Sequence, residues 1–363
     1  MGFRDKVLKK ILAEPDKIVA FSLDFSPLSP LVSLKFVSSR GVLIGYDEHD
    51  REVYFNPLEP RNPHFIIVGG SGTGKSLFCK QLAYYLSDEY QVVFLDPHGD
   101  YNKLVQAIGG IVFDCRKNVF EPLAFVRESP EKLDEFVDVL KIVFGLEDEA
   151  YLVKEKLKKR MSLSQCLSEL PPILRSKLES AFNFFDNKEK IDLGELIDEG
   201  AHFSLSFRME RSPLGEKLAR FVSALFILNL THFVWGEEKH KPERFVFMDE
   251  AHRIVLKLGG DLLKSMFFEL RKTGTGLIAI SQNLQHFDLE LLDQVGGLLV
   301  LSPVSEYTLV KLDALFELSA ENRLFIKRRS PRDKWFPERA LYIIVGSTPV
   351  KVFLKIDEKI LRY

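Results

Sequence analysis

The chain has 363 residues, three cysteines and a formal net charge of −2, and 46% of its residues are hydrophobic. These values are typical of an ordinary globular protein, exclude a global basic signature and argue against a disulfide framework. The first residues lack the apolar core of a signal peptide, and the longest apolar stretch, 221–235, is too short to span a bilayer. We therefore expect a cytoplasmic protein, in which any contact with nucleic acid comes from a local patch or an assembled pore.

Residues 1–60 are expected to form a small β-rich region in front of a larger domain. A short charged helix near 6–12 precedes the strand-like runs, which prolines separate. These runs cover residues 18–21, 31–37, 42–46 and 52–55. The polar turn 47–51 between the last two runs predicts a hairpin.

Residues 61–363 alternate strand and helix, which predicts an α/β domain with a mainly parallel sheet. Strands are expected at 65–68, 92–95, 111–113, 201–205, 245–248, 277–281 and 298–301, helices at 77–86, 214–235, 261–272 and 306–315, and a final hairpin at 341–356. A helical insertion at about 126–195 interrupts this pattern, and Ser162 and Gln165 in it form a predicted capping box. The basic run 154–160 is either a solvated face or a contact for DNA or a partner.

The loop 69–76 has the sequence GGSGTGKS and lies between an apolar strand and a helix. This is the context of a phosphate-binding loop, in which glycines aim backbone N–H groups inward, Lys75 adds a charge and Ser76 offers a hydroxyl to magnesium. The candidate phosphate-binding residues are Gly70, Ser71, Gly72, Thr73, Gly74, Lys75, Ser76 and Leu77. The loop therefore predicts a site for ATP and Mg²⁺.

Asp249 and Glu250 directly follow the apolar run 245–248. A buried strand would hold Asp249 rigidly in a magnesium shell, while Glu250 can orient or deprotonate the attacking water. The pair therefore predicts hydrolysis of the nucleotide as well as binding. Asp96 also closes an apolar strand and is a rival for the magnesium role, but no second acid adjoins it, and the role of Asp100 is similarly open.

Arg271 and Gln282 each allow two interpretations. Arg271 either caps the carboxyl end of a helix or is an arginine finger that reaches the γ-phosphate in a neighbouring subunit. Gln282 is either a γ-phosphate sensor or a polar residue at a strand end. His252 is expected to be a structural, hydrogen-bonded histidine. The basic stretch 327–334 is interpreted as a solvated loop, with nucleic-acid backbone or a subunit interface as the alternatives.

Five motifs together resemble the FtsK/HerA superfamily of ring-forming motor ATPases, in particular HerA and the conjugation ATPases of type IV secretion. They are the phosphate loop 69–76, the run LDPHGDY at 95–101, MDEAH at 248–252, Arg271-Lys272-x-Gly274 and Ser281-Gln282. The run LDPHGDY is the most specific of these after the two nucleotide motifs. The similarity covers about residues 40–356.

This resemblance implies a RecA-like P-loop NTPase that forms a homo-oligomer, usually a hexamer, with ATP at the subunit boundaries. It also implies that Gln282 is the sensor and that Arg271 is a finger acting in trans. The expected function is a ring-forming motor that couples ATP hydrolysis to translocation of double-stranded DNA. One alternative is a secretion, conjugation or pilus ATPase peripheral to a membrane complex, and another is a non-hydrolytic, ATP-gated scaffold. A nuclease or a membrane secretion protein is the implied partner.

Overall fold

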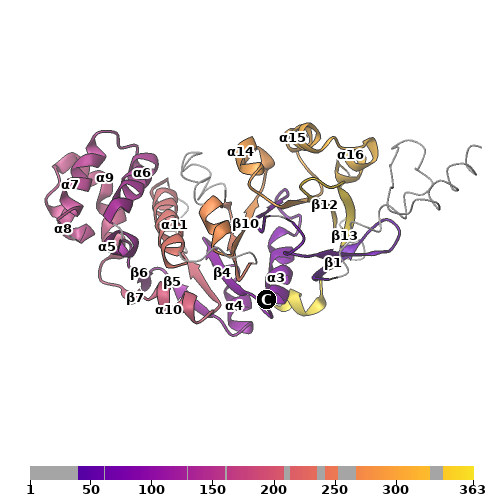
Figure 1. The fold of residues 1–363 in the computed structure, drawn as a ribbon, viewed down its shortest axis with the longest axis horizontal. Helices are drawn as coiled ribbons and strands as arrows, with labels where there is room; N and C mark the ends of the chain where they lie inside the picture. The colour runs from indigo at the N-terminus through magenta and orange to yellow at the C-terminus, as the bar shows by residue number, and fades with distance from the viewer. Residues whose placement is uncertain are drawn as a thin grey trace, which may run out of the picture.

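A computed structural model of the chain describes residues 40–60, 62–128, 130–159, 162–207, 213–234, 242–251, 267–327 and 338–363 (Figure 1). The strands are β1 (Val42–Tyr46), β2 (Glu52–Phe55), β3 (Phe65–Val68), β4 (Gln91–Asp96), β5 (Ile111–Asp114), β6 (Asn118–Phe120), β7 (Glu189–Ile191), β8 (Phe203–Ser206), β9 (Arg244–Met248), β10 (Thr275–Ser281), β11 (Gly297–Leu301), β12 (Arg339–Ile344) and β13 (Val350–Leu354). The helices are α3 (Lys75–Leu86), α4 (Asn102–Ala107), α5 (Ala124–Glu128), α6 (Leu133–Phe144), α7 (Glu149–Leu157), α8 (Leu163–Ser168), α9 (Pro172–Phe182), α10 (Leu193–Asp198), α11 (Pro213–Phe233), α14 (Leu289–Leu292), α15 (Glu306–Phe316) and α16 (Ala320–Lys327), with short 3₁₀ turns that include η5 (Glu358–Arg362). Residues 267–272 are also helical.

Eleven of the described strands form one sheet, in the order β2-β1-β13-β12-β11-β3-β10-β9-β4-β8-β5. The strands from β11 to β5 in this order are parallel, and those from β12 to β2 are antiparallel to their neighbours. The predicted α/β class and mainly parallel sheet are therefore confirmed. The buried runs of apolar residues in β3, β4, β9 and β10 are typical of strands that helices cover on both faces.

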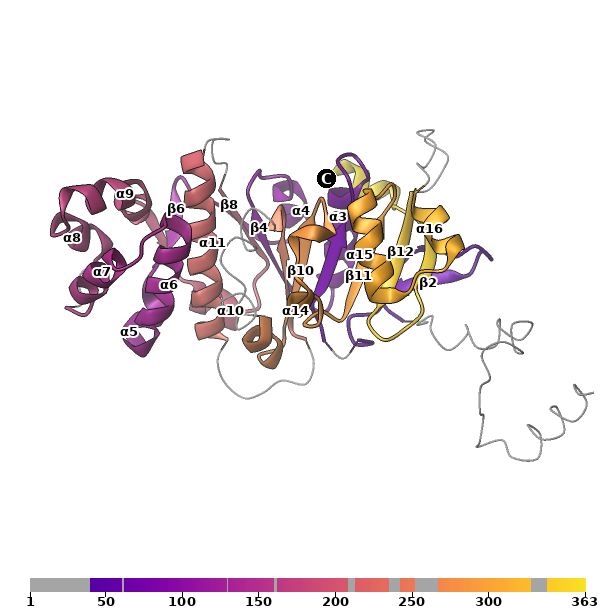
Figure 2. The ribbon, with the colours of Figure 1, turned by 90° about the horizontal axis from the view of Figure 1, so that it is seen from above.

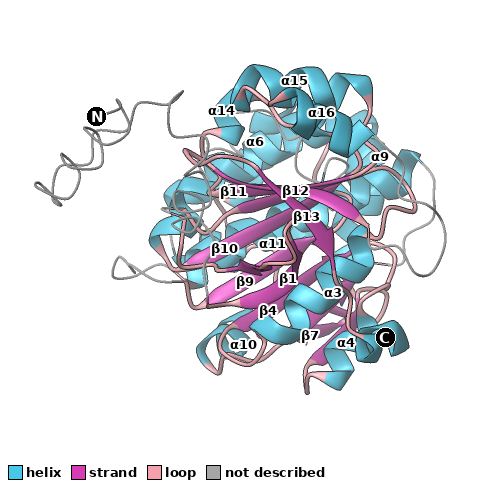
Figure 3. Ribbon diagram, turned by 90° about the vertical axis from the view of Figure 1, so that its right-hand side faces the viewer, coloured by secondary structure: helices cyan, strands magenta, loops and turns pink. Residues whose placement is uncertain are grey.

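Two hydrophobic cores lie on the two faces of the sheet. Successive residues of β3 alternate between them, because strand side chains point to opposite faces: Ile66 and Val68 join one core, and Phe65 and Ile67 the other. The first core packs against α11, α14 and α15, and the second against α3 and α4 (Figure 3). The sheet is therefore the middle layer of three.

The region before residue 60 differs in one respect from the sequence-based expectation. The strands β1 and β2 pair as an antiparallel hairpin, as predicted, but β1 also pairs with β13, with Gly45 opposite Leu354. Residues 42–55 are therefore part of the main sheet, because the closing hairpin β12–β13 offers β1 a free edge. The helix expected near 6–12 and the runs at 18–21 and 31–37 lie outside the described residues.

The helical insertion forms the end of the molecule farthest from β12 and β13 (Figure 2). Helices α5 to α9 pack on one another and on α11, and the short pair β6–β7 joins the insertion to the sheet region. The capping box predicted at Ser162 and Gln165 is present, and Gly145 ends α6 in the left-handed conformation with φ 66°. Among the described helices, no segment is both long and apolar enough to cross a membrane.

Candidate nucleotide-binding site

Four parallel strands bring the predicted nucleotide motifs to one edge of the sheet. In β10, Ser281 is paired with Val68 of β3, and Ala279 with Met248 of β9, while β4 pairs with the other side of β9. Residues that follow these strand ends therefore lie beside one another. The four residues or motifs that follow are the phosphate loop after β3, Gln282 after β10, Asp249 after β9, and the loop after Asp96 of β4.

The phosphate loop turns sharply between β3 and α3. Gly72 and Gly74 have φ values of +76° and +85°, which side chains other than glycine rarely adopt. At Gly69 a Cβ atom would lie 2.6 Å from the Thr73 hydroxyl and 2.9 Å from the Leu301 Cβ, so only glycine fits there. The Thr73 hydroxyl donates to the Gly70 carbonyl at 2.9 Å. The strand, loop and helix predicted from the sequence are thus all present.

Lys75 begins α3 and folds back over the loop. Its Nζ donates to the carbonyls of Gly69 at 2.7 Å and Gly70 at 2.9 Å. Burial lowers the pKa of the ammonium group, and the negative charges of Asp249 and Glu250 oppose this effect. The Lys75 charge therefore lies close enough to the paired acids for their charges to act on it.

Asp249 is almost fully buried at the end of β9, and its Oδ1 accepts the Glu250 N–H at 2.8 Å. Burial is the main cause that raises the pKa of Asp249 to about 6, and the charges of Glu250 and Asp96 add to it. Glu250 has a left-handed backbone, with φ 51°, which is uncommon for a non-glycine residue and is often found at functional sites. The two carboxyl groups thus form a site of high negative charge density.

Gln282 is exposed at the end of β10, and its Nε2 donates to Glu250 Oε1 at 3.2 Å. Residues 250 and 282 lie far apart in the sequence, and the parallel strands β9 and β10 bring them together. The amide therefore touches the side chain that the sequence singles out as the base.

Asp96 organises a loop and does not pair with a second acid. It is fully buried, and its carboxylate accepts the N–H groups of His98 at 3.2 Å, Gly99 at 2.7 Å and Tyr101 at 2.9 Å. Burial raises the pKa of Asp96, and these hydrogen bonds oppose the rise. The Asp96 charge also raises the pKa of Asp249, so it acts electrostatically on the site, while Asp100 is exposed.

Tyr101 is a site residue that the sequence analysis did not select. It is fully buried, stacks on Phe94 with ring centroids 4.6 Å apart, and places its hydroxyl beside Asp249 and Ser76. That hydroxyl lowers the pKa of Asp249. The motif at 95–101 indicates this loop, but the direction of the tyrosine side chain depends on the turn that Asp96 closes.

Arg271 lies at the opposite edge of the sheet. It is exposed at the end of the helix 267–272, just before the amino end of β10, whereas Gln282 follows the carboxyl end. Seven residues of β10 separate the two edges, a span of about 20 Å at the usual rise of a strand. Arg271 is therefore out of reach of the phosphate loop in its own chain.

The basic run on α7 is largely neutralised by nearby acids. Lys154 pairs with Asp134, Lys156 with Glu169 at 2.7 Å, and Lys158 with Glu155 at 2.6 Å. This arrangement favours the interpretation as a solvated face. Lys327 pairs with Glu306 at 3.1 Å, and the remainder of the stretch 327–334, like His252, lies outside the described residues.

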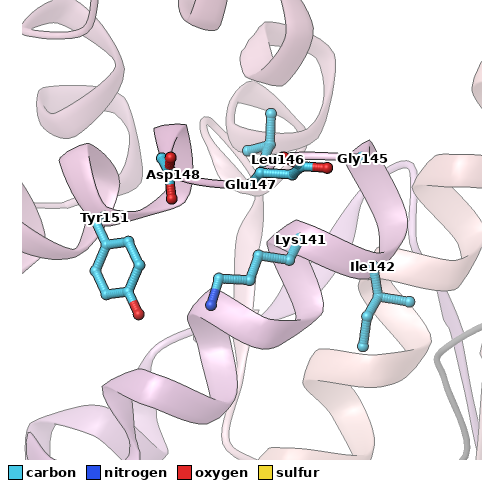
Figure 4. A pocket seen from close by; sticks show the side chains of 7 residues that line it. All are labelled: Lys141, Ile142, Gly145, Leu146, Glu147, Asp148 and Tyr151. Atoms are coloured by element: carbon cyan, nitrogen blue, oxygen red, sulfur yellow. The ribbon is translucent and has the colours of Figure 1, made fainter.

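A pocket in the helical insertion lies between the end of α6 and the start of α7 (Figure 4). Its lining residues are Lys141, Ile142, Gly145, Leu146, Glu147, Asp148 and Tyr151. The Lys141 ammonium lies 4.9 Å from the centre of the Tyr151 ring, a cation–π contact. None of the predicted nucleotide motifs contributes to this pocket, so it is separate from the site described above.

The groups at the carboxyl edge fit a magnesium nucleotide. Ser76 offers a hydroxyl and Asp249 a carboxylate, and such oxygen ligands are the ones that Mg²⁺ prefers. The glycine loop and the start of α3 supply N–H groups and a partial positive charge for phosphate. Burial is the main cause of the raised pKa of Asp249, and the charges of Glu250 and Asp96 add to it; a divalent cation bound there would favour the charged carboxylate.

Comparison with known proteins gives matches for the family model and for the fold. Residues 41–199 match the family model described as Helicase HerA, central domain. VirB4 of Thermoanaerobacter pseudethanolicus aligns with a TM-score of 0.70 and 17% identity, over 90% of this chain and 99% of that chain. The plasmid coupling protein TrwB in complex with a non-hydrolysable ATP analogue aligns with a TM-score of 0.62 and 18% identity, over 91% and 92%. No curated protein sequence matches the chain.

A second TrwB structure, in complex with ADP and Mg²⁺, aligns with a TM-score of 0.59 and 17% identity, over 89% of this chain and 92% of that chain. These structures share the fold with this chain at low identity. The chain has a RecA-like fold similar to those of VirB4 and TrwB, and the resemblance to the FtsK/HerA superfamily of P-loop ATPases that its motifs indicated is confirmed.

Proposed function

We propose that this protein is a P-loop ATPase that assembles into a ring, most simply a hexamer, and couples ATP hydrolysis to movement of double-stranded DNA. The observation that supports it best is the meeting of three motifs at one sheet edge, where Lys75 faces Asp249 and Glu250, and Gln282 contacts Glu250. The folds shared with VirB4 and TrwB support the same class of protein.

In this proposal the loop N–H groups and Lys75 bind the β- and γ-phosphates of ATP. Ser76 and Asp249 would hold Mg²⁺, which neutralises charge on the phosphate oxygens during transfer. Glu250 orients the attacking water and accepts its proton. Gln282, hydrogen-bonded to Glu250, senses whether the γ-phosphate is present.

Arg271 is assigned to the site of a neighbouring subunit. Its place at the amino edge of the sheet, about 20 Å from the phosphate loop of the same chain by strand rise, supports a contact in trans. The DNA would contact the inner surface of the ring. The helical insertion is a weaker candidate for this DNA contact, because the lysines of its basic run already pair with acids.

The proposal is tested by ATP turnover with and without double-stranded DNA, in the wild type and in Glu250→Gln. Loss of a general base lowers turnover by about 10² to 10⁴-fold, and ATP binding is expected to persist. Glu131→Gln, an exposed acid in the insertion, is the matched control and should leave turnover unchanged.

The same assay separates the rival functions. Stimulation by DNA supports the translocase, and an ATPase indifferent to DNA favours a secretion, conjugation or pilus motor at a membrane complex. A wild type that binds ATP without turnover would be a scaffold, and this result would contradict the proposed motor. Particle size measured with ATP present tests ring assembly.

A further inference from the structure

A buried histidine joins the strand that leads into the phosphate loop to the helix that bears Arg271. His64 immediately precedes β3 and is fully buried. Its N–H donates to Asn62 Oδ1 at 3.1 Å, and its carbonyl accepts the Gly296 N–H at 2.8 Å. These two hydrogen bonds fix the backbone of His64 independently of the contacts that its ring makes.

The two nitrogens of the His64 ring contact two different elements. The N–H of Leu277, in β10, donates to Nδ1 at 2.9 Å, so Nδ1 carries no proton. The neutral ring then has its proton on Nε2, which donates to the Phe267 carbonyl at 2.7 Å. The ring also packs edge-on against the Phe267 ring, with centroids 4.9 Å apart.

The neutral state of His64 follows from its surroundings. Burial is the main cause that lowers the pKa of His64 to about 4; the hydrogen bond to the Phe267 carbonyl opposes this shift, and the nearby Arg271 guanidinium contributes to it. A protonated ring could not accept the Leu277 N–H, because both of its nitrogens would be donors. Both hydrogen bonds therefore persist at neutral pH.

We propose that His64 is a positioning residue for the arginine finger. Phe267 begins the described part of the helix that carries Arg271 in its last turn, so the hydrogen bond to the Phe267 carbonyl fixes that helix against β3, which leads into the phosphate loop. Arg271 and the phosphate loop of one subunit are then rigidly connected through His64. A movement of that phosphate loop therefore displaces Arg271 at the ATP site of the neighbouring subunit. This inference rests on the proposed role of Arg271 in trans.

Two substitutions separate the two hydrogen bonds of the ring. The side-chain amide of glutamine reaches the position of Nε2, so His64→Gln keeps a donor for the Phe267 carbonyl. The shorter asparagine reaches only the position of Nδ1, so His64→Asn keeps an acceptor for the Leu277 N–H and releases the helix. We expect His64→Asn to lower turnover by about 100-fold with ATP affinity unchanged, because small misplacements of catalytic groups cost about that much. His64→Gln should stay close to the wild type.

Mixed rings give the decisive measurement. A mixture of His64→Asn with Lys75→Ala should regain turnover, because the Lys75→Ala subunits supply well-placed fingers to intact phosphate loops. A mixture of His64→Asn with Arg271→Ala should not, because neither subunit supplies one. Recovery in the second mixture would mean that His64→Asn damages only its own phosphate loop, and would overturn the inference.

Two further variants complete the test: the double variant that combines His64→Asn with Arg271→Ala, and the single variant Arg271→Ala. If His64 acts through Arg271, then His64→Asn lowers turnover no further when Arg271 is already alanine, and an additional loss would overturn the inference. Equal turnover in His64→Asn and His64→Gln would also overturn it. If Arg271→Ala alone keeps full turnover, the role of Arg271 in trans fails and His64 has no finger to position, whereas Glu250→Gln still reports on hydrolysis itself.

Discussion

The two edges of the parallel sheet differ in the groups that surround a buried charged side chain. At the carboxyl edge, Asp249 is buried beside Glu250 and Asp96, and its pKa rises to about 6. At the amino edge, Arg244 is equally buried, yet its Nε donates to Gln91 Oε1 at 3.0 Å and its Nη1 to the Thr275 hydroxyl at 3.3 Å. Burial lowers the pKa of Arg244 too, so burial disfavours the charge at both edges, and at the amino edge two neutral acceptors partly offset that cost.

The amino edge is a connected polar network. Besides accepting from Arg244, Gln91 donates through Nε2 to the carbonyls of Leu196 at 2.8 Å and Ala201 at 2.7 Å, which follow the helical insertion. Fully partnered buried groups stabilise a fold, whereas a buried charge without full compensation lowers stability. The difference indicates that the amino edge serves the fold and that the carboxyl edge serves chemistry, with Arg271 as the exception.

The largest expected effect is on ATP turnover, from substitution of Arg271. Arg271→Ala should lower turnover by about 10³ to 10⁵-fold, the range known for arginine fingers, while ATP binding and thermal stability stay near those of the wild type. The reason is that Arg271 is exposed, and in the proposed ring it acts at the site of a neighbouring subunit. Turnover is measured for the variant alone and mixed with Lys75→Ala, whose subunits should restore activity.

Lys272→Ala is the matched control for Arg271→Ala. It removes the adjacent cation, which pairs with Glu269 at 3.2 Å and lies over the Phe268 ring. Turnover close to the wild type is expected for this variant. A failure of Lys75→Ala to restore activity to Arg271→Ala would argue that Arg271 does not act across an interface.

The contrast between the edges also explains what the sequence could predict. The phosphate loop and the Asp249-Glu250 pair were found because each is a local pattern directly after a strand. Strand pairing then placed Gln282 beside Glu250, which spacing alone left open.

Two residues that contact distant segments were not selected from the sequence: no local pattern marks His64, and the motif at 95–101 contains Tyr101 without showing which way its side chain points. Tyr101 reaches Asp249 only because Asp96 closes the turn between them, and His64 joins elements about 200 residues apart in the chain. For the same reason the boundary expected at residue 60 did not anticipate the pairing of β1 with β13. Long-range pairing depends on the whole topology.

Arg244→Met should disrupt the polar network at the amino edge and lower the stability of the fold. The Gln91 oxygen and the Thr275 hydroxyl would lose their buried donor, which costs about 1 to 3 kcal/mol of unfolding free energy for such groups. Turnover per folded molecule should be unchanged, because the network is remote from the phosphate loop. Chemical denaturation measures the loss, and Arg323→Met, which removes a surface ion pair with Asp313, should cost less than about 1 kcal/mol.

Asp249→Asn should have the reverse outcome to Arg244→Met: stability should rise and turnover should be lost. The pKa of Asp249 is about 6 in the folded protein and ordinarily 3.8, so at pH 7 the charged carboxylate lowers stability, and that cost declines as the pH falls from about 6 to 3.8. Removal of the charge should therefore raise the unfolding free energy by about 1 to 3 kcal/mol at pH 7 without magnesium, while turnover is lost.

Thermal unfolding with a chelator at pH 7 and pH 4.5 checks this sign for Asp249→Asn. The gain over the wild type should shrink at the lower pH, where the wild-type carboxyl group is protonated. Asp100→Asn, an exposed acid in the neighbouring loop, is the control and should change neither property. A variant less stable than the wild type at pH 7 would contradict the contrast between the edges.

Tyr101→Phe should give the smallest effect and sharpens the comparison within the carboxyl edge. The phenyl ring can keep the stack on Phe94, so stability should change little, but the hydroxyl that lowers the pKa of Asp249 is lost. The acid limb of the pH profile of turnover should therefore move to higher pH by less than about one unit, which is 1.36 kcal/mol. Tyr90→Phe, which packs on Phe245 away from the site, should leave the profile in place. A shift to lower pH in Tyr101→Phe would mean that the hydroxyl disfavours the charged form of Asp249, and the tyrosine would then belong with the groups that keep this carboxyl group protonated.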